Sequence, residues 1–151
     1  IYSKCFGIVC CLAKSKYNLP CVVLDLGTAT TISVLDKDGA FLGGQICAGL
    51  RISLEALNNK TSQLPGISID TPKSVIGKNS IDCMKAGLVI GTACMIDGLI
   101  DRIEEELSMP VSVVATGGLA SEVIKNCKRE IEVNDNLLLD GLREIYLKNK
   151  K

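Results

Sequence analysis

The sequence contains no histidine, and its eight cysteines include no Cys-x-x-Cys pair. Structural zinc sites are built from closely spaced cysteine and histidine ligands, so this pattern argues against one. Most of the cysteines stand among Val, Ile, Leu and Ala, which favours free, buried thiols in a reducing compartment over disulfides. We therefore expect a cytoplasmic protein whose cysteines hold neither zinc nor disulfides.

An excess of charge of either sign is also absent, since 17 Lys and Arg residues balance 17 Asp and Glu residues. That balance lacks the basic surplus typical of nucleic-acid-binding domains. No apolar run reaches the roughly 18 residues of a membrane span. With 47% hydrophobic and 23% charged residues, the 151-residue chain has the composition of one soluble globular domain. We expect neither nucleic acid nor a membrane as a partner.

The order of apolar segments predicts a mixed α/β domain. Three strands joined by short turns, expected over 21–25, 30–36 and 40–46, form an antiparallel meander. Two later strands are expected over 111–115 and 130–133, with a loop over 61–78. Helices are expected over 1–17, 50–59, 80–106, 119–126 and 136–148, the third capped by Asn79 or Ser80. Hairpin strands followed by helix-separated strands indicate a mixed sheet covered by helices.

The turn at residues 25–31, Asp-Leu-Gly-Thr-Ala-Thr-Thr, carries the clearest chemistry. Its glycine lets backbone N–H groups approach an anion, its threonines donate O–H groups, and its carboxylate can hold a positive counter-ion. These properties indicate a nucleotide-handling lobe. The same residues also suit an ordinary hairpin, because Asp, Gly and Thr are common in turns. The segment by itself leaves both interpretations open.

Four segments, taken in order, resemble the type III pantothenate kinases of the acetate kinase, sugar kinase, Hsp70 and actin superfamily. They are 22–31 (VVLDLGTATT), 42–57 (LGGQICAGLRISLEAL), 75–80 (VIGKNS) and 115–120 (ATGGLA). The resemblance implies a ribonuclease H-like lobe, with a mixed sheet of an antiparallel meander plus parallel strands, flanked by helices. Family members have two such lobes with ATP held between them, and this chain resembles the C-terminal one.

The resemblance also implies how the chain is organised and what it does. We expect residues 20–151 to form the C-terminal lobe and residues 1–19 to form a helical lead-in left from the inter-lobe region. Because the first residue is Ile1 rather than Met, we expect the sequence to start partway through a longer protein. The implied reaction is ATP-dependent phosphorylation of pantothenate to 4'-phosphopantothenate in coenzyme A biosynthesis. The implied cofactors are ATP, Mg²⁺ and a monovalent cation, K⁺ or NH₄⁺, and the implied assembly is a homodimer.

The family's nucleotide and cation positions fall on the first of these segments. Asp25 matches the residue that coordinates the monovalent cation, and Thr28 matches a residue that contacts ATP. Gly27 and Thr30 belong to the same loop and are expected to line the ATP site. The alternative role for Asp25 and Thr28 is stabilisation of the turn through bonds to the backbone.

The remaining implied site residues lie further along the chain. Gly117 and Gly118 match a turn that borders the adenosine pocket, where the alternative is a plain tight strand-helix turn. Ser80 stands where the family commonly has a threonine that touches pantothenate across a dimer interface, and helix capping explains Ser80 equally well. Arg51 belongs to a segment near the substrate and could equally be a solvated helix residue.

One family motif is not matched. The family carries Gly-x-Asp-Arg upstream of the Asp25 position, where the aspartate is the general base and the arginine helps to hold the substrate. Here Cys5 and Phe6 occupy those two positions, and residues 1–24 contain no Asp, Glu or Arg. We therefore expect no kinase activity from this polypeptide alone, and an inactive relative serving as a regulatory or accessory binding protein is the alternative. A sugar or acyl kinase of the same superfamily is disfavoured by the Gly-Lys-Asn-Ser segment.

Overall fold

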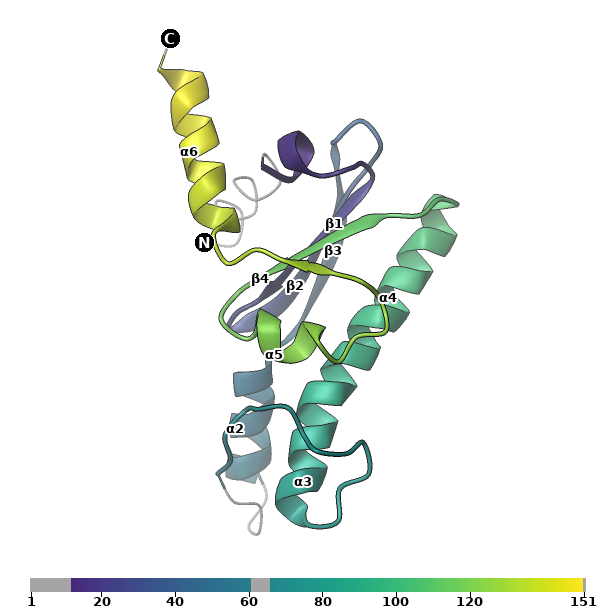
Figure 1. Cartoon of the computed structure of the whole chain (residues 1–151), viewed down its shortest axis with the longest axis vertical. Helices are drawn as coiled ribbons and strands as arrows, with labels where there is room; N and C mark the ends of the chain where they lie inside the picture. The colour runs from purple at the N-terminus through teal and green to yellow at the C-terminus, as the bar shows by residue number, and fades with distance from the viewer. Residues whose placement is uncertain (1–11, 61–65, 151) are drawn as a thin grey trace.

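A computed structural model describes residues 12–60 and 66–150, which form one five-stranded mixed sheet with helices on it (Figure 1). The strands are β1 (Cys21–Leu26), β2 (Ala29–Leu35), β3 (Phe41–Ala48), β4 (Ser112–Thr116) and β5 (Glu132–Val133). Their order in the sheet is β3-β2-β1-β4-β5. The first three strands pair antiparallel, whereas β4 pairs parallel to β1 and β5 parallel to β4. The predicted meander and mixed sheet are confirmed.

The turn between β2 and β3 follows from its residues. The Asp36 carboxylate accepts hydrogen bonds from the backbone N–H groups of Asp38 and Ala40, each at 2.8 Å. Gly39 has a φ of +74°, a conformation that costs glycine little. An aspartate that bonds its own turn, followed by a glycine in the left-handed region, is a stable way to reverse a chain.

β1 is covered on both faces. Val22, Leu24 and Leu26 belong to a core cluster with the long helix α4 (Gly91–Leu107). Cys21 and Val23 point to the other face, where they join a second cluster that includes Leu12, Ala13 and Leu137. Residues 12–16 are helical and cover this second face. A strand buried on both sides in this way is typical of the centre of a sheet.

The long predicted helix is present but not uniform. It comprises α3 (Ser80–Lys85), the π-helical segment η1 (Ala86–Ile90) and α4, in direct succession. Asn79 caps it, because its side-chain oxygen accepts the Asp82 backbone N–H at 2.9 Å. The sequence predicted the length and a cap at Asn79 or Ser80. It did not predict the π-helical segment, a rare conformation that occurs mostly as single turns inside α-helices.

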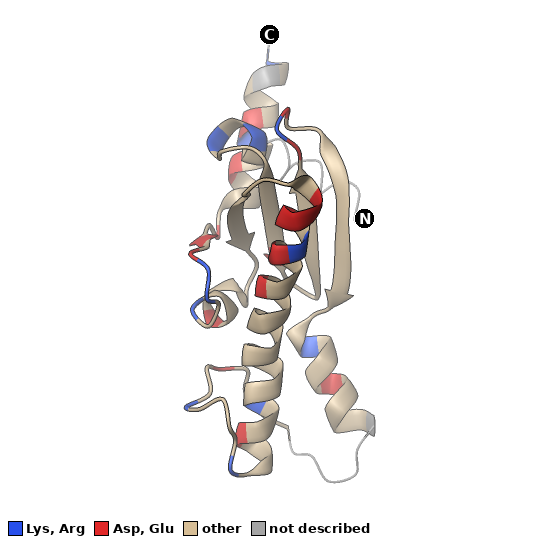
Figure 2. Cartoon of the chain, turned by 90° about the vertical axis from the view of Figure 1, so that its right-hand side faces the viewer, with Lys and Arg blue, Asp and Glu red and all other residues tan. Residues whose placement is uncertain are grey.

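α4 packs against the sheet through Ile96, Ile100 and Ile103, a spacing typical of the buried face of a core helix. In the described ranges, the continuous helix Ser80–Leu107 is the one candidate whose length and composition would allow it to cross a membrane, and 39% of its most apolar window is buried. Figure 2 shows that acidic and basic residues gather toward the C-terminal end of α4 and on the loops, while the strands are nearly free of charge.

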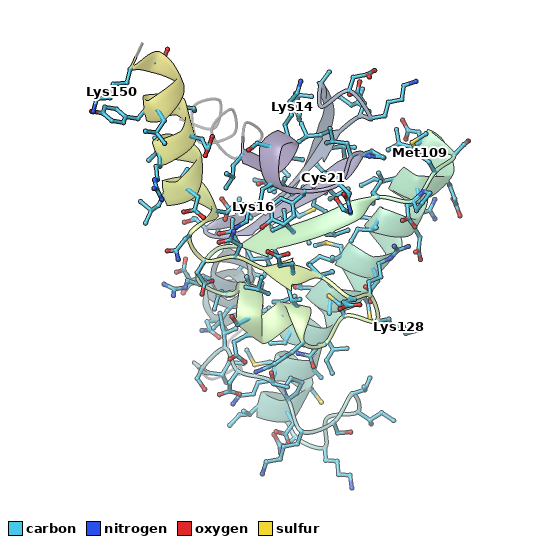
Figure 3. The ribbon with its side chains drawn as sticks, turned by 45° about the horizontal axis from the view of Figure 1, so that its top comes forward. Lys14, Lys16, Cys21, Met109, Lys128 and Lys150 are labelled. Carbon is cyan, nitrogen blue, oxygen red and sulfur yellow. The ribbon has the colours of Figure 1, made fainter. Side chains whose placement is uncertain are left out.

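The described part of the chain has three further helices, namely α2 (Leu50–Lys60), α5 (Ala120–Ile124) and α6 (Leu137–Asn149). α2 follows directly after β3, and α5 follows the turn after β4. α6 stands away from the rest of the molecule (Figure 1). Lys16, which Figure 3 labels on the helix at residues 12–16, forms a 3.9 Å ion pair with Asp140 of α6. The large apolar side chains that α6 exposes are Leu138, Leu139, Leu142, Tyr146 and Leu147.

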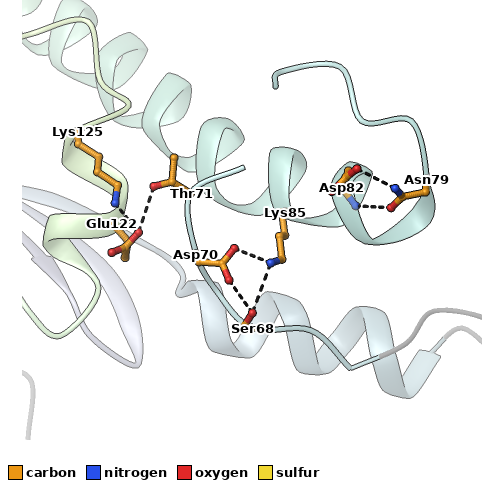
Figure 4. Close-up of polar contacts among 8 residues, drawn as sticks. All are labelled: Ser68, Asp70, Thr71, Asn79, Asp82, Lys85, Glu122 and Lys125. Carbon is orange, nitrogen blue, oxygen red and sulfur yellow. Dashed lines mark hydrogen bonds and ion pairs between the residues drawn. The ribbon is translucent and has the colours of Figure 1, made fainter. Parts of the chain in front are cut away.

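Polar contacts hold the loop that precedes α3 (Figure 4). The Lys85 ammonium lies 2.5 Å from the Asp70 carboxylate, and this hydrogen bond lowers the pKa of Asp70. Thr71 donates a 3.1 Å hydrogen bond to Glu122 of α5, which also pairs with Lys125. The loop is therefore tied both to the helix that follows it and to α5.

Some boundaries differ from those expected. α5 is shorter than the predicted segment 119–126, because a turn follows it. β5 is shorter than the predicted segment 130–133, because a turn precedes it. Residues 12–16 of the predicted helix 1–17 are helical. The rest of that helix, with Cys5 and Phe6, lies outside the described residues.

The cysteines follow the prediction only in part. The five in the described ranges are free thiols, and Cys21 is buried. The expectation of buried thiols is wrong for Cys83 and Cys94, which are exposed on the long helix. Burial raises the pKa of Cys127 to about 12, so this thiol stays protonated at neutral pH.

The turn after β4 crosses closely over the end of β1. Gly117 has a φ of +103°, and a Cβ atom there would lie only 2.6 to 2.8 Å from backbone atoms of Leu26. A Cβ atom at the neighbouring Gly118 would meet nothing within 4 Å. The first glycine is therefore required by packing and conformation, and the second is not.

These two glycines form a matched pair for mutation. We expect Gly117→Ala to lower the free energy of unfolding by about 1 to 3 kcal/mol or more, because it adds backbone strain and a clash. Gly118→Ala should change it by no more than about 0.5 kcal/mol. Urea unfolding followed by circular dichroism measures both, and equal effects of the two substitutions would contradict the packing of this turn on β1.

Candidate functional site

Three turns meet at one edge of the sheet. β1 and β3 both run antiparallel to β2, and β4 runs parallel to β1, so the carboxyl ends of β1, β3 and β4 lie at the same edge. The turns that follow them contain Gly27 and Thr28, then Gly49, then Gly117 and Gly118. Ligands of open α/β sheets commonly bind outside this edge. The structure thus brings together the two predicted glycine-containing turns.

Backbone contacts hold these turns against one another. A Cβ atom on Gly49 would lie 2.1 Å from the Thr28 carbonyl oxygen, so only glycine permits this approach. The Leu119 N–H donates a 3.4 Å hydrogen bond to the Leu26 carbonyl. With Gly117 also packed on Leu26, the end of β1 has a neighbouring turn on each side.

Asp25 lies at the centre of this edge and is half-buried. Within residues 12–60 and 66–150, no group donates a hydrogen bond to its carboxylate and no cation pairs with it. Burial raises the pKa of Asp25, because the charged form has lost part of its water. A Cβ atom on Gly27 would lie 3.2 Å from the Asp25 Oδ1 atom, so the glycine leaves space beside it. An uncompensated, partly buried carboxylate fits a bound cation, since hard cations prefer oxygen ligands.

The two predicted threonines of this turn differ in position. Thr28 is exposed at the tip of the turn, where its hydroxyl is open to a ligand. Thr30 is fully buried and pairs with Leu26, so its side chain lies on the core face of the sheet rather than on the Asp25 face. The Thr30 hydroxyl has no hydrogen-bond partner in the described part of the chain. The structure therefore does not bring the Thr30 side chain together with Asp25.

The two predicted substrate residues lie apart from each other. Arg51 is exposed in the first turn of α2, two residues after Gly49, and so lies next to the sheet edge. Ser80 is exposed at the start of α3, at the end of the molecule away from the sheet (Figure 1). Because Asn79 is the cap, capping does not account for Ser80. Ser80 instead lines an open groove of about 520 Å³ with Leu57, Cys83, Met84, Gly87 and Leu88.

Two further polar residues at this edge were not singled out from the sequence. Thr31 on β2 and Thr116 on β4 are the register partners of Asp25 on either side. Side chains of register partners point to the same face of a sheet, so all three lie in one row. The pairing of Asp25 with Thr31 could have been read from the hairpin, which is symmetrical about Thr28. The pairing with Thr116 requires the tertiary structure.

The uncompensated charge of Asp25 predicts a gain in stability when it is removed. Since the pKa is higher in the folded than in the unfolded protein, stability falls as pH rises from the ordinary carboxyl value of 3.8 through the raised one. In buffer free of alkali and ammonium ions at pH 7, we expect Asp25→Asn to raise the midpoint of thermal unfolding by on the order of a few degrees.

That gain should shrink as pH falls toward the ordinary carboxyl range, where the wild-type side chain is also neutral. Differential scanning calorimetry of both proteins across this pH range measures it. Asp38→Asn, which changes an exposed turn carboxylate, is the control for net charge and should leave the midpoint nearly unchanged. An Asp25→Asn variant that is less stable than wild type at pH 7 would show that the carboxylate has a structural partner.

Comparison with solved structures agrees with this architecture. A Campylobacter jejuni protein described as a conserved putative Baf family transcriptional activator superposes with a TM-score of 0.69 and 19% identity, over 99% of this chain and 67% of that one. The Alp12 filament structure superposes with a TM-score of 0.61 and 13% identity, over 97% and 53%. At these identities the likeness concerns the fold alone. The shared fold is the predicted mixed sheet, with parallel and antiparallel strand pairs and flanking helices.

Sequence comparison gives the family. The model of the type III pantothenate kinase family matches residues 7–102. The type III pantothenate kinase of Myxococcus xanthus is 45% identical over 137 residues, which cover 91% of this chain and 54% of that protein. The one of Rhodospirillum rubrum is 42% identical over 138 residues, with the same coverage. The chain spans about half the length of these curated relatives. On the match of family model and relatives, the chain belongs to the type III pantothenate kinase family.

Proposed function

We propose that the chain is the C-terminal, nucleotide- and cation-binding lobe of a cytoplasmic type III pantothenate kinase. The reaction would transfer the γ-phosphoryl group of ATP to the primary hydroxyl of pantothenate. ATP would supply the phosphoryl group. Mg²⁺ and a monovalent cation, K⁺ or NH₄⁺, would neutralise the negative charge of the ATP phosphates. The observation that carries the proposal is the half-buried Asp25 carboxylate, which has no partner among the described residues and lies beside the turn of Gly27 and Thr28.

In this proposal the residues at the edge bind and orient rather than react. Thr28 would donate its hydroxyl and N–H to phosphate oxygens, and Gly27 would let those oxygens approach the backbone. Asp25 would hold the monovalent cation next to the phosphates. Gly118, which is exposed and has open space beside it, would form part of the adenosine pocket. None of these residues takes the proton of the pantothenate hydroxyl, because the family's general base belongs to the unmatched motif.

The missing half of the relatives' length gives the first test. We expect the purified chain to show no measurable ADP release with ATP, Mg²⁺, K⁺ and pantothenate. Two hybrids would carry, upstream, the part of the Myxococcus xanthus kinase that this chain does not span. One joins it before Ile1 and keeps Cys5 and Phe6. The other continues the relative's sequence to the position of Pro20 and therefore restores Gly-x-Asp-Arg.

Only the second hybrid should turn over, at ordinary kinase rates of about 1 per second or faster. Turnover by the chain alone would show that neither the first lobe nor the acid is needed. Activity of both hybrids would show that Cys5 and Phe6 are tolerated. Should the second hybrid bind ATP in calorimetry without turnover, the alternative of a regulatory or accessory binding protein, motivated by the unmatched motif, would replace the kinase.

We also propose that the chain forms a homodimer through the surface around the groove. Ser80 lies in this groove, away from the Asp25 edge of its own copy, so it would reach substrate bound at the edge of a second copy. The helices that line the groove and the loop before α3 carry further exposed apolar side chains, namely Ile52 on α2, Ile81 on α3, and Val75 and Ile76 on the loop. Several exposed apolar side chains near one groove favour an interface there.

Light scattering after size exclusion should give twice the chain mass of 16.1 kDa. We expect Ile81→Asp, which places a charge beside Ser80, to shift the protein to the monomer mass. Leu139→Asp on α6 changes an apolar residue outside the groove that is even more exposed (64%, against 45% for Ile81), and it should leave the dimer intact. A wild-type protein that elutes at the monomer mass, or a dimer broken by Leu139→Asp and kept by Ile81→Asp, would contradict this interface.

A further inference from the structure

Thr31, Asp25 and Thr116 form a row across three neighbouring strands. The two threonines are not among the site residues that the family resemblance implies. Thr31 and Thr116 flank Asp25 on the two neighbouring strands, and neighbouring strands lie about 4.7 to 4.9 Å apart. Ile46 on β3 is the register partner of Thr31 and is 68% exposed. The row is therefore open to solution on its β3 side.

The face that carries the row is covered at one end only. Leu12, Ala13 and Leu137 pack on Cys21 and Val23, toward the amino end of β1. Asp25 and Thr31, toward the carboxyl end, are half-buried and remain reachable. Thr116 is only 7% exposed. Its hydroxyl makes no hydrogen bond in the described ranges, and it keeps some accessible surface. A ligand at Asp25 would therefore lie beside two threonine side chains on the same face of the sheet.

On this geometry, and resting on the proposed cation at Asp25, we infer that the hydroxyls of Thr31 and Thr116 complete the oxygen donor set for a monovalent cation. One carboxylate balances one positive charge, and the two hydroxyls add neutral oxygens. Among the described residues no group of three or more His, Cys, Asp or Glu side chains could hold a metal ion. A protein-held divalent ion usually has more carboxylates, and Mg²⁺ requires near-ideal octahedral oxygens at about 2.0 to 2.1 Å. Ligands fixed by strand spacing suit a larger, less demanding ion.

The neighbouring residue provides a matched control. Thr30 precedes Thr31 on the same strand, but its side chain lies on the opposite, core face. Substitution of threonine by valine removes the hydroxyl and keeps the branched shape. The same chemical change can therefore be made inside the proposed donor set, by Thr31→Val and Thr116→Val, and outside it, by Thr30→Val.

The experiment measures cation binding without catalysis. The midpoint of thermal unfolding is followed while KCl replaces choline chloride at constant total chloride, without nucleotide and again with ATP and Mg²⁺. The increase in stability with K⁺ concentration gives an apparent Kd for K⁺. We expect stabilisation of the wild type and of Thr30→Val, none for Asp25→Asn, and an apparent Kd weakened about tenfold for Thr31→Val and for Thr116→Val. Thr31→Ser and Thr116→Ser, which keep the hydroxyl, should bind as the wild type does.

The outcomes separate this inference from the proposal on which it rests. If the wild type is stabilised by K⁺ and Asp25→Asn is not, while both row variants bind within twofold of Thr30→Val, the threonine ligands are wrong and the cation at Asp25 stands. If the wild type shows no specific effect of K⁺ in either condition, both the proposed cation at Asp25 and the proposed threonine ligands are wrong. Loss of binding in the serine variants would show that packing rather than the hydroxyl matters.

Discussion

The pairing of β1 on both sides places every feature of the candidate site. β2 and β4 hydrogen-bond to its two edges, and side chains pack on both of its faces from Cys21 to Leu24. A strand held in this way has little freedom in position or register. Its last two residues therefore present a fixed carboxylate at Asp25 and a fixed backbone end at Leu26. The glycine-containing turns after β3 and β4 pack on that end and share its rigidity.

Local signals were sufficient for much of the fold. The short turn between β2 and β3, a helix cap at Asn79 or Ser80 and the apolar runs of the first strands each depend on a few residues, and each was predicted. The π-helical segment and the exposure of Cys83 and Cys94 were not. Local composition shows that a helix is apolar, but which of its faces stays uncovered depends on where α2 lies. The groove between α2 and the long helix leaves Cys83 open to solution.

The candidate site shows the same division. Asp25, Gly27 and Thr28 belong to one turn, so a motif locates them together. Thr30 belongs to the same motif, yet strand alternation turns its side chain into the core. Thr31 and Thr116 come to Asp25 through cross-strand register, and the second of these pairings joins strands that are far apart in the sequence. A motif read along the chain gives neighbours in sequence, whereas a donor set is defined by neighbours across the sheet.

Asp25 connects the stability of the lobe to its proposed chemistry. The fold places this carboxylate where burial disfavours its charge and supplies no described partner, which costs stability that a purely structural residue would not. A cation bound there would offset the cost of burying the charge, so its binding would stabilise the folded lobe. The flanking hydroxyls carry no charge and so could add oxygen ligands without adding to the repulsion between the carboxylate and a polyphosphate. An arrangement of one charged and several neutral oxygens would hold the cation firmly enough to offset phosphate charge, while leaving the net charge of the protein part of the site at minus one.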